Sequence, residues 1–279
     1  MKKIAFGLIV LYALVLFIAP GLNAQETYDI SNYFPLDVGN TWEYDARKAV
    51  SGAEGVEELA IMRSSIQGPE MLNAEEVVVL EENDRGPWLY LASKPEGILL
   101  YKTRYMDHYD LIEEPQFLFY PKSLGVGQEA KHSTSIKSYD LSNNLIAEGT
   151  LELVVRLEEV KDLTVPAGTF NNCIKLYRSI STKTGKGNMD FTEIQWLAPD
   201  TGKVSGQHTI AISNGNSINF QEKFELKSAV VKGNKIGNIK KSEEPVQAEE
   251  LPKIEEPSKI EESPKVEEQP GTEVPIKTE

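Results

Sequence analysis

The sequence predicts an all-β domain, an antiparallel meander that closes into a barrel or curled sandwich. Two observations support this prediction. Short runs alternate apolar and polar residues, and clusters of turn residues separate these runs. Beyond the N-terminal segment, no long run repeats its apolar residues with the 3.6-residue period of a helix. Closure of the sheet would also protect strand edges from pairing with other chains.

The N-terminal segment, residues 1–24, has the pattern of a secretory signal peptide. It begins with Lys2 and Lys3, continues with uncharged residues 4–19, and ends with Pro20-Gly21 and the small residue Ala24. A helical span needs about 20 apolar residues, so a retained membrane anchor is the weaker interpretation. We therefore expect an exported protein, periplasmic or extracellular, with no transmembrane span in its mature part.

Cysteine usage narrows this expectation. Cys173 is the only cysteine, so no cysteine near the cleavage site can carry a lipid and no internal disulfide can form. The sequence thus predicts a protein that is not a lipid-anchored lipoprotein. Cys173 itself lies in an apolar run, where a buried small hydrophobic residue is expected rather than a nucleophile.

Residues 25–240 form the predicted β domain, and their patterns distinguish two kinds of strand. Alternating residues in 151–158, 174–180 and 220–227 predict half-buried strands. Continuous apolar residues in 77–80 and 98–101 predict strands that are buried on both faces. Between two such runs, Asn214-Gly215 predicts a hairpin turn.

The C-terminal segment, residues 241–279, is acidic and repetitive. It contains 12 Glu and 5 Lys, with Glu pairs recurring every six residues, and it has no aromatic residue. Such a composition cannot bury enough apolar surface to fold, so disorder is predicted, with a role either as a spacer or as a docking arm. The whole chain carries a net charge of −14, which argues against a nucleic-acid partner and against adhesion to anionic lipid surfaces.

Three segments of the β domain contain turn-forming motifs, and the second and third of them predict tight reversals between strands. Pro35-Leu36 with Gly39 and Trp42 begins the domain, Val165-Pro166-Ala167-Gly168-Thr169-Phe170 follows in its middle, and Ala198-Pro199-Asp200-Thr201-Gly202 comes later. In this order they resemble a broad set of bacterial exported proteins of unknown function, over roughly residues 33–231. The third segment departs from the set, which has glycine and an apolar residue where Asp200-Thr201 stands. The resemblance implies a barrel-like envelope domain and no particular activity.

Candidate site residues are few. His108 and Asp110 lie two residues apart, so on a strand they face one side and could share a metal or form a base and its orienting partner; a polar surface strand is the alternative. Trp42, Trp88 and Trp196 are candidates for ligand binding, although aromatic residues more often fill a core. Catalytic motifs, zinc-ligand spacings and phosphate loops are absent, so we identify no catalytic residue and expect no cofactor.

These observations favour a non-catalytic binding module of the bacterial envelope, with a lipid, a glycan or an envelope protein as its partner. One alternative is a hydrolase or metal-assisted enzyme that uses His108 and Asp110. Another is a structural or adaptor protein that uses the acidic segment as a spacer. A wide apolar interior open at one end would favour a lipid carrier, and a filled core would favour a scaffold.

Overall fold

The computed structural model describes residues 26–50, 58–83, 86–185, 187–213 and 217–237. The predicted signal peptide, the acidic segment and the Asn214-Gly215 turn lie outside these residues. No helix in the described part of the chain is long and apolar enough to cross a bilayer. The elements are β1 (Thr27–Asp29), η1 (Ile30–Tyr33), β2 (Thr41–Val50), β3 (Glu58–Leu72), β4 (Glu75–Glu82), β5 (Trp88–Lys94), β6 (Gly97–Arg104), β7 (His108–Ile112), β8 (Phe117–Pro121), β9 (Ser123–Gly125), β10 (Glu129–Asp140), β11 (Leu145–Val165), β12 (Gly168–Thr184), β13 (Gly187–Ala198), β14 (Gly202–Ser213), β15 (Ser217–Val231) and β16 (Asn234–Gly237).

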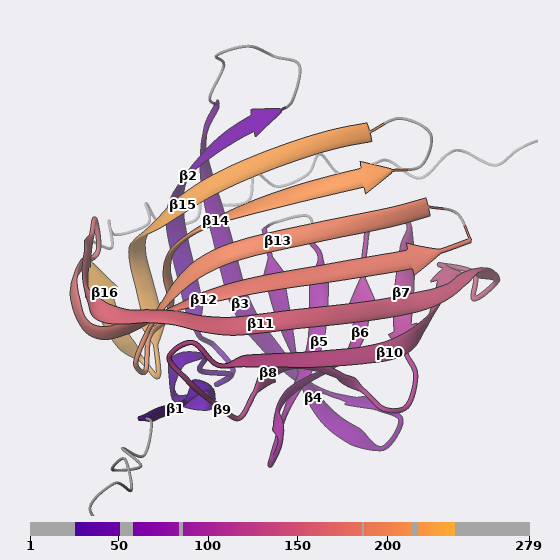
Figure 1. Ribbon diagram of the computed structural model, residues 1–279, viewed down its shortest axis with the longest axis horizontal. Coiled ribbons are helices and arrows are strands. Elements are labelled where there is room, and N and C mark those ends of the chain that lie inside the picture. Colours follow the sequence, from indigo (N-terminus) through magenta and orange to yellow (C-terminus); the bar gives the residue numbers. More distant parts are fainter. Residues whose placement is uncertain (1–25, 51–57, 84–85, 186, 214–216, 238–279) are drawn as a thin grey trace, which may run out of the picture. The chain divides into compact units, whose positions relative to one another are not determined.

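A closed antiparallel barrel forms the body of the domain, as the sequence predicts. Its strands follow the order β14-β13-β12-β11-β10-β7-β6-β5-β4-β3-β2-β15, and pairing of β14 with β15 closes the ring. In Figure 1, β11 to β15 run across one side of the barrel, and β2 to β7 cross behind them at a steep angle. The barrel therefore has two walls whose strands run in different directions, which is how a strongly tilted small barrel packs its interior.

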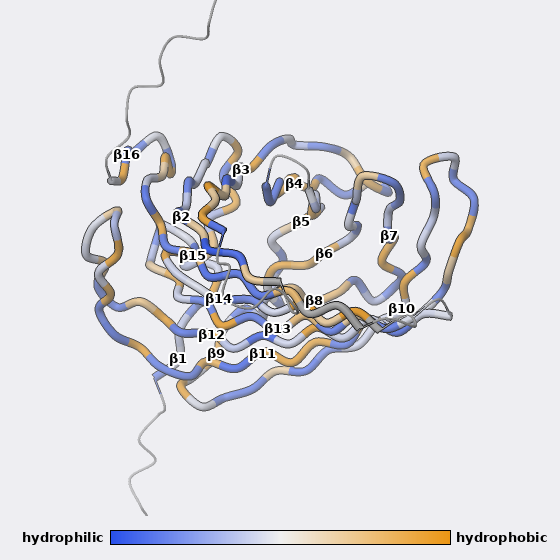
Figure 2. The backbone as a smooth tube through the Cα atoms, turned by 90° about the horizontal axis from the view of Figure 1, so that it is seen from above, coloured by the Kyte–Doolittle hydropathy of each residue, from blue (hydrophilic) through white to orange (hydrophobic). Residues whose placement is uncertain are grey.

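The strand faces follow the predicted alternation. On β11, Leu151, Leu153, Val155 and Leu157 are buried in the interior, whereas the residues between them are exposed or half-buried. The same alternation appears along the strands in Figure 2, where hydrophobic and hydrophilic stretches follow each other closely. Residues 77–80 and 98–101 are almost wholly buried because a second apolar cluster covers the outer face of β4, β5 and β6. This confirms the prediction that these strands are buried on both faces.

Two predicted reversals are present as tight turns. Pro166 and Ala167 join β11 to β12, and Val165 pairs directly with Gly168, whose φ of +139° suits glycine. Asp200 and Thr201 likewise join β13 to β14. These residues shape hairpins, so the motifs that carry the family resemblance are fold determinants.

One end of the barrel is closed by the segment that precedes β2. Ile30, Tyr33 and Phe34 are buried there, and the Phe34 ring lies 4.9 Å from Tyr120 and 6.3 Å from Phe119. Backbone hydrogen bonds link this segment to Lys122 and Asp200. We call this closed end, together with the buried side chains of Trp42, Leu176 and Leu197, the base of the barrel.

Candidate functional site

A belt of charged side chains crosses the barrel interior above the base. Five inward-facing residues stand directly opposite one another on the adjacent strands β12, β13, β14, β15 and β2. In this order they are Arg178, Glu193, His208, Glu222 and Lys48. We call these five residues the charged belt. Interior charge is costly unless it is paired, so the partners within the belt decide whether it is stable.

The first half of the belt is a buried ion-pair cluster. The Arg178 Nη2 donates to Glu193 Oε2 over 2.7 Å, and Lys203 Nζ lies 3.4 Å from the other Glu193 oxygen and donates to Glu82 over 2.8 Å. Burial alone would raise the pKa of Glu193, but the Lys203 and Arg178 cations outweigh it and lower that pKa to about 2. The Glu193 carboxylate is therefore ionised at neutral pH.

The second half of the belt is centred on Glu222. His208 Nε2 lies 3.0 Å from Glu222 Oε2, and Lys48 Nζ lies 3.2 Å from Oε1, close enough for an ion pair although its angle is not that of a hydrogen bond. Burial would raise the pKa of Glu222, but His208 and Lys48 lower it below its ordinary value. The His208 ring packs beside Phe191, Phe220 and Phe224.

Arg178 is the belt residue with unused hydrogen-bond donors. Its side chain is 4% exposed, and its guanidinium carbon lies 4.3 Å from the ring centre of Phe119 and 4.9 Å from that of Tyr120. Among the described residues, Nε and Nη1 of Arg178 have no hydrogen-bond acceptor. Buried N–H groups normally have an acceptor, so these two positions need an explanation.

Above the belt lies a cavity of about 380 Å³ that Arg178, Glu193, His208, Glu222 and Lys48 help to line. Two residues further along the strands, a second row of directly opposed side chains is apolar, and its members are half-buried. The row consists of Ile180, Phe191, Ile210 and Phe220. Leu89 and Leu100 lie on the opposite wall, and Ile136 of β10 and Leu151 of β11 complete much of the lining. We call this cavity with its apolar row the upper lumen.

His108 and Asp110 on β7, the pair that the sequence suggested, contact different residues. The His108 ring lies against Tyr105, with ring centres 4.4 Å apart, and its Nδ1 is 2.7 Å from Asp107. Asp110 lines the upper lumen and accepts a hydrogen bond from Ser138 over 2.5 Å, and burial raises its pKa. No group of three or more His, Cys, Asp or Glu side chains in the described ranges is arranged to hold a metal. A metal or catalytic role for this pair stays a prediction.

None of the three tryptophans lines the upper lumen. Trp42 is buried in the base and donates from Nε1 to the Thr201 carbonyl over 2.6 Å. Trp88 packs against the outer apolar cluster beneath Arg104, and Trp196 is half-buried with the Lys161 ammonium 4.6 Å from its ring. Cys173 is completely buried, as predicted, and burial raises the pKa of its thiol to about 11.

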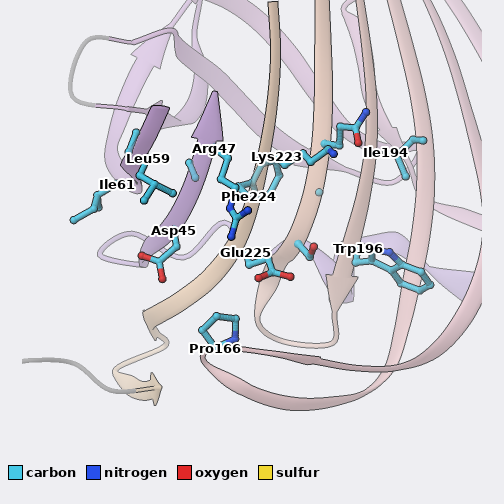
Figure 3. Close-up of a pocket in the computed structure, with 15 residues that line it drawn as sticks. Asp45, Arg47, Leu59, Ile61, Pro166, Ile194, Trp196, Lys223, Phe224 and Glu225 are labelled. Carbon is cyan, nitrogen blue, oxygen red and sulfur yellow. The ribbon is translucent and has the colours of Figure 1, made fainter. Parts of the chain in front are cut away.

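A second hollow lies on the outer surface, across the neighbouring strands β3, β2, β15, β14 and β13. It is an open groove of about 930 Å³, with Leu59 and Ile61 on one side and Ile194 and Trp196 on the other (Figure 3). Charged residues of both signs lie between them, and no buried unpartnered polar atom of the described chain belongs to its lining. The upper lumen is therefore the better candidate site, since it combines enclosure, an apolar wall and unmatched donors.

The belt escaped sequence analysis although the sequence contains a signal for it. Arg178 continues the apolar face of Ile174 and Leu176, and Glu222 lies between Phe220 and Phe224 on their face. A charge in such a position is predicted to be buried. The turn of a hairpin fixes the register of its two strands. Placing the β12–β13 turn would therefore pair Arg178 with Glu193, and placing the β14–β15 turn would pair His208 with Glu222.

Comparisons with known proteins describe the fold and give no activity. A DUF3108-like family model matches residues 103–207, which include Arg178, Glu193 and Lys203. The chain resembles a lipoprotein candidate from Parabacteroides distasonis at 18% identity and TM-score 0.34, covering 70% of this chain and 98% of that one. No curated protein matches the sequence.

Two further solved structures resemble the chain to a similar degree. One is an exported-protein candidate with a YmcC-like fold from Bacteroides fragilis, at 13% identity and TM-score 0.32, covering 70% of this chain and 98% of that one. The other is the hypothetical lipoprotein YmcC from Escherichia coli, at 13% identity and TM-score 0.33, covering 66% and 83%. At such low values the likeness carries no functional inference.

Proposed function

We propose that the protein is an exported envelope protein whose barrel interior binds a single-chain lipid. The observation that carries the proposal is the upper lumen, a cavity of about 380 Å³ with the apolar row on its wall. Small-molecule sites typically occupy about 300–1,000 Å³ and are mostly apolar with a few convergent polar groups. The signal-like segment at residues 1–24 supports a place of action outside the cytoplasm.

The lining favours a lipid over the glycan that the sequence also allowed. A sugar needs many hydrogen-bond partners and commonly stacks on an aromatic face, whereas the row of Ile180, Phe191, Ile210 and Phe220 offers mainly apolar contact. The tryptophans that would stack on a sugar lie elsewhere. An alkyl chain gains about 0.8 kcal/mol for each buried CH₂ group, which suits this wall.

A dye-binding experiment with a blocked lumen tests this function. The uncharged dye N-phenyl-1-naphthylamine should fluoresce on entering the upper lumen, and single-chain lipids should displace it. Leu151→Trp adds a ring to the inward face of β11 and should abolish dye binding, whereas Val154→Trp adds the same ring to the outward face and should leave it intact.

The outcomes separate binding inside the barrel from binding elsewhere. Circular dichroism and the Tm of both variants would verify that each folds. A dye signal that persists in folded Leu151→Trp would contradict a site in the lumen. An absence of dye or lipid binding by the unmodified protein would overturn the proposed function.

A further inference from the structure

We propose that Arg178 binds the acidic head group of the lumen ligand, so that the ligand is a single-chain amphiphile bearing a carboxylate or phosphate. This inference rests on the proposed function and specifies its ligand. The side chain of Arg178 is 4% exposed and lines the cavity, and its Nε and Nη1 lack an acceptor among the described residues. Nε carries one N–H and Nη1 carries two, all able to donate to an oxyanion.

The unused donors of Arg178, and not a net positive charge of the cavity, favour an anionic acceptor. Three cations (Arg178, Lys203 and Lys48) and four carboxyl groups (Glu82, Asp110, Glu193 and Glu222) line the cavity, with His208 and Tyr105 as its further titratable groups. Glu193 is shared between Arg178 and Lys203, so it uses only one of the guanidinium nitrogens. A carboxylate or phosphate accepts hydrogen bonds from a guanidinium and also attracts its charge, whereas a neutral hydroxyl group offers only the hydrogen bond.

The orientation of the ligand follows from the order of the two rows. Arg178 belongs to the charged belt next to the base, and the apolar row lies two residues further along the strands. An amphiphile would therefore enter head first, with its oxyanion at Arg178 and its chain against Ile180, Phe191 and Ile210. The Phe119 and Tyr120 rings pack against the guanidinium and hold it in place for this contact.

Chain-matched probes test the head-group preference. Decanoic acid, decyl phosphate and decan-1-ol share one chain length, and at pH 8 the first two are anionic. Displacement of N-phenyl-1-naphthylamine should show the two anions binding about ten-fold or more tightly than the alcohol. The stronger anion would identify the head group as carboxylate or phosphate.

Paired variants locate the preference at Arg178. The double variant Arg178→Met/Glu193→Gln removes the guanidinium and the charge that it balances, so it should reduce the preference for the anions over decan-1-ol to near one-fold. Arg156→Met is the matched control, since Arg156 also donates to a glutamate and lies over an aromatic ring, but on the outward face of β11. This control should keep the full preference.

A spectroscopic readout covers the case in which the double variant fails to fold. The chain has six arginines, so their Nε–Hε signals in a proton–nitrogen NMR spectrum of the unmodified protein form a small set. The signal that is lost in Arg178→Lys is that of Arg178. Decanoate or decyl phosphate should shift that signal, and decan-1-ol should not. Equal binding of acid and alcohol, or an unmoved Arg178 signal with anion bound, would overturn this inference and leave the lipid function standing. Failure of all three probes to bind would overturn both.

Discussion

The base and the upper lumen are built from the same strands, but they differ in what fills them. In the base, Leu176, Leu197 and Trp42 are buried against the segment that closes the barrel. In the upper lumen, Ile180, Phe191 and Ile210 occupy equivalent inward positions yet are only half-buried and line a cavity. One strand, β12, thus passes from a close-packed core to the wall of a cavity within four residues.

Because of this difference, we expect the base to contribute mainly to stability and the upper lumen mainly to the proposed binding. In a close-packed region each buried methylene group stabilises the fold, so the base should contribute most of the unfolding free energy. Side chains that line a cavity make fewer packing contacts, so their substitution should lower the unfolding free energy by less. The charged belt lies between the two, where its groups are buried enough to interact strongly and near enough to the cavity to meet a ligand.

The largest expected effect is that of Trp42→Ala in the base. The indole is 6% exposed, donates to the Thr201 carbonyl and packs beside Gly202, where a Cβ would lie 3.2 Å from the indole nitrogen. Its removal should lower the unfolding free energy by about 3–5 kcal/mol. Trp196→Ala on the outer face should cost only about 1 kcal/mol. Urea unfolding of both variants measures the difference, and equal losses would contradict a base-centred stability.

The charged belt should give the next largest effect, and it depends on pH. The folded-state pKa of Glu193 is about 2, below its ordinary value of 4.5, so its contribution is present above about pH 5 and is lost as the pH falls toward 2. At pH 7, Glu193→Gln should cost on the order of 3 kcal/mol because it leaves Arg178 and Lys203 without this carboxylate. That cost should shrink as urea unfolding is repeated down to pH 3.

An exposed ion pair supplies the control for this pH dependence. Glu152 accepts from Lys183 over 3.0 Å at the surface, so Glu152→Gln should cost roughly 0–1 kcal/mol at either pH. A Glu193→Gln cost that stays constant from pH 7 to pH 3 would show that the belt does not hold Glu193 ionised.

The strands and turns of the barrel were predicted more fully from the sequence than the side-chain contacts inside it. Alternation located the strands and their inward faces, as on β11, because burial of one sheet face leaves a period of two in the residues. Pro166-Ala167 and Asp200-Thr201 located turns because few residues fit such tight reversals. Each of these features depends on neighbours in the chain.

The closed base and the charged belt depend on contacts between distant residues. Phe34 meets Tyr120 in the base, and no local pattern specifies that β8 leaves the main order of the barrel to pair with β6. Arg178 and Glu222 interrupt apolar faces, and their burial becomes plausible only when Glu193 and Lys48 are placed opposite them. Sequence analysis named the tryptophans as candidates for ligand binding, although core filling was the more common role, whereas the interior ion pairs lie beside the better candidate site.

The smallest expected effect is that of Ile180→Ala, which is compared with Leu176→Ala at another inward position of β12. Leu176 is completely buried in the base, whereas Ile180 is half-buried on the wall of the upper lumen, four residues away. Leu176→Ala should lower the unfolding free energy by about 2–5 kcal/mol because the closed base cannot collapse around the lost atoms. Ile180→Ala should cost only about 1 kcal/mol, since solvent already reaches the side chain and the existing cavity merely enlarges.

Ile180→Ala should nevertheless weaken N-phenyl-1-naphthylamine binding, which Leu176→Ala should leave unchanged while the protein is folded. Similar stability losses at the two positions would mean that the upper lumen is packed as a core, and a scaffold would then be the better explanation of the barrel.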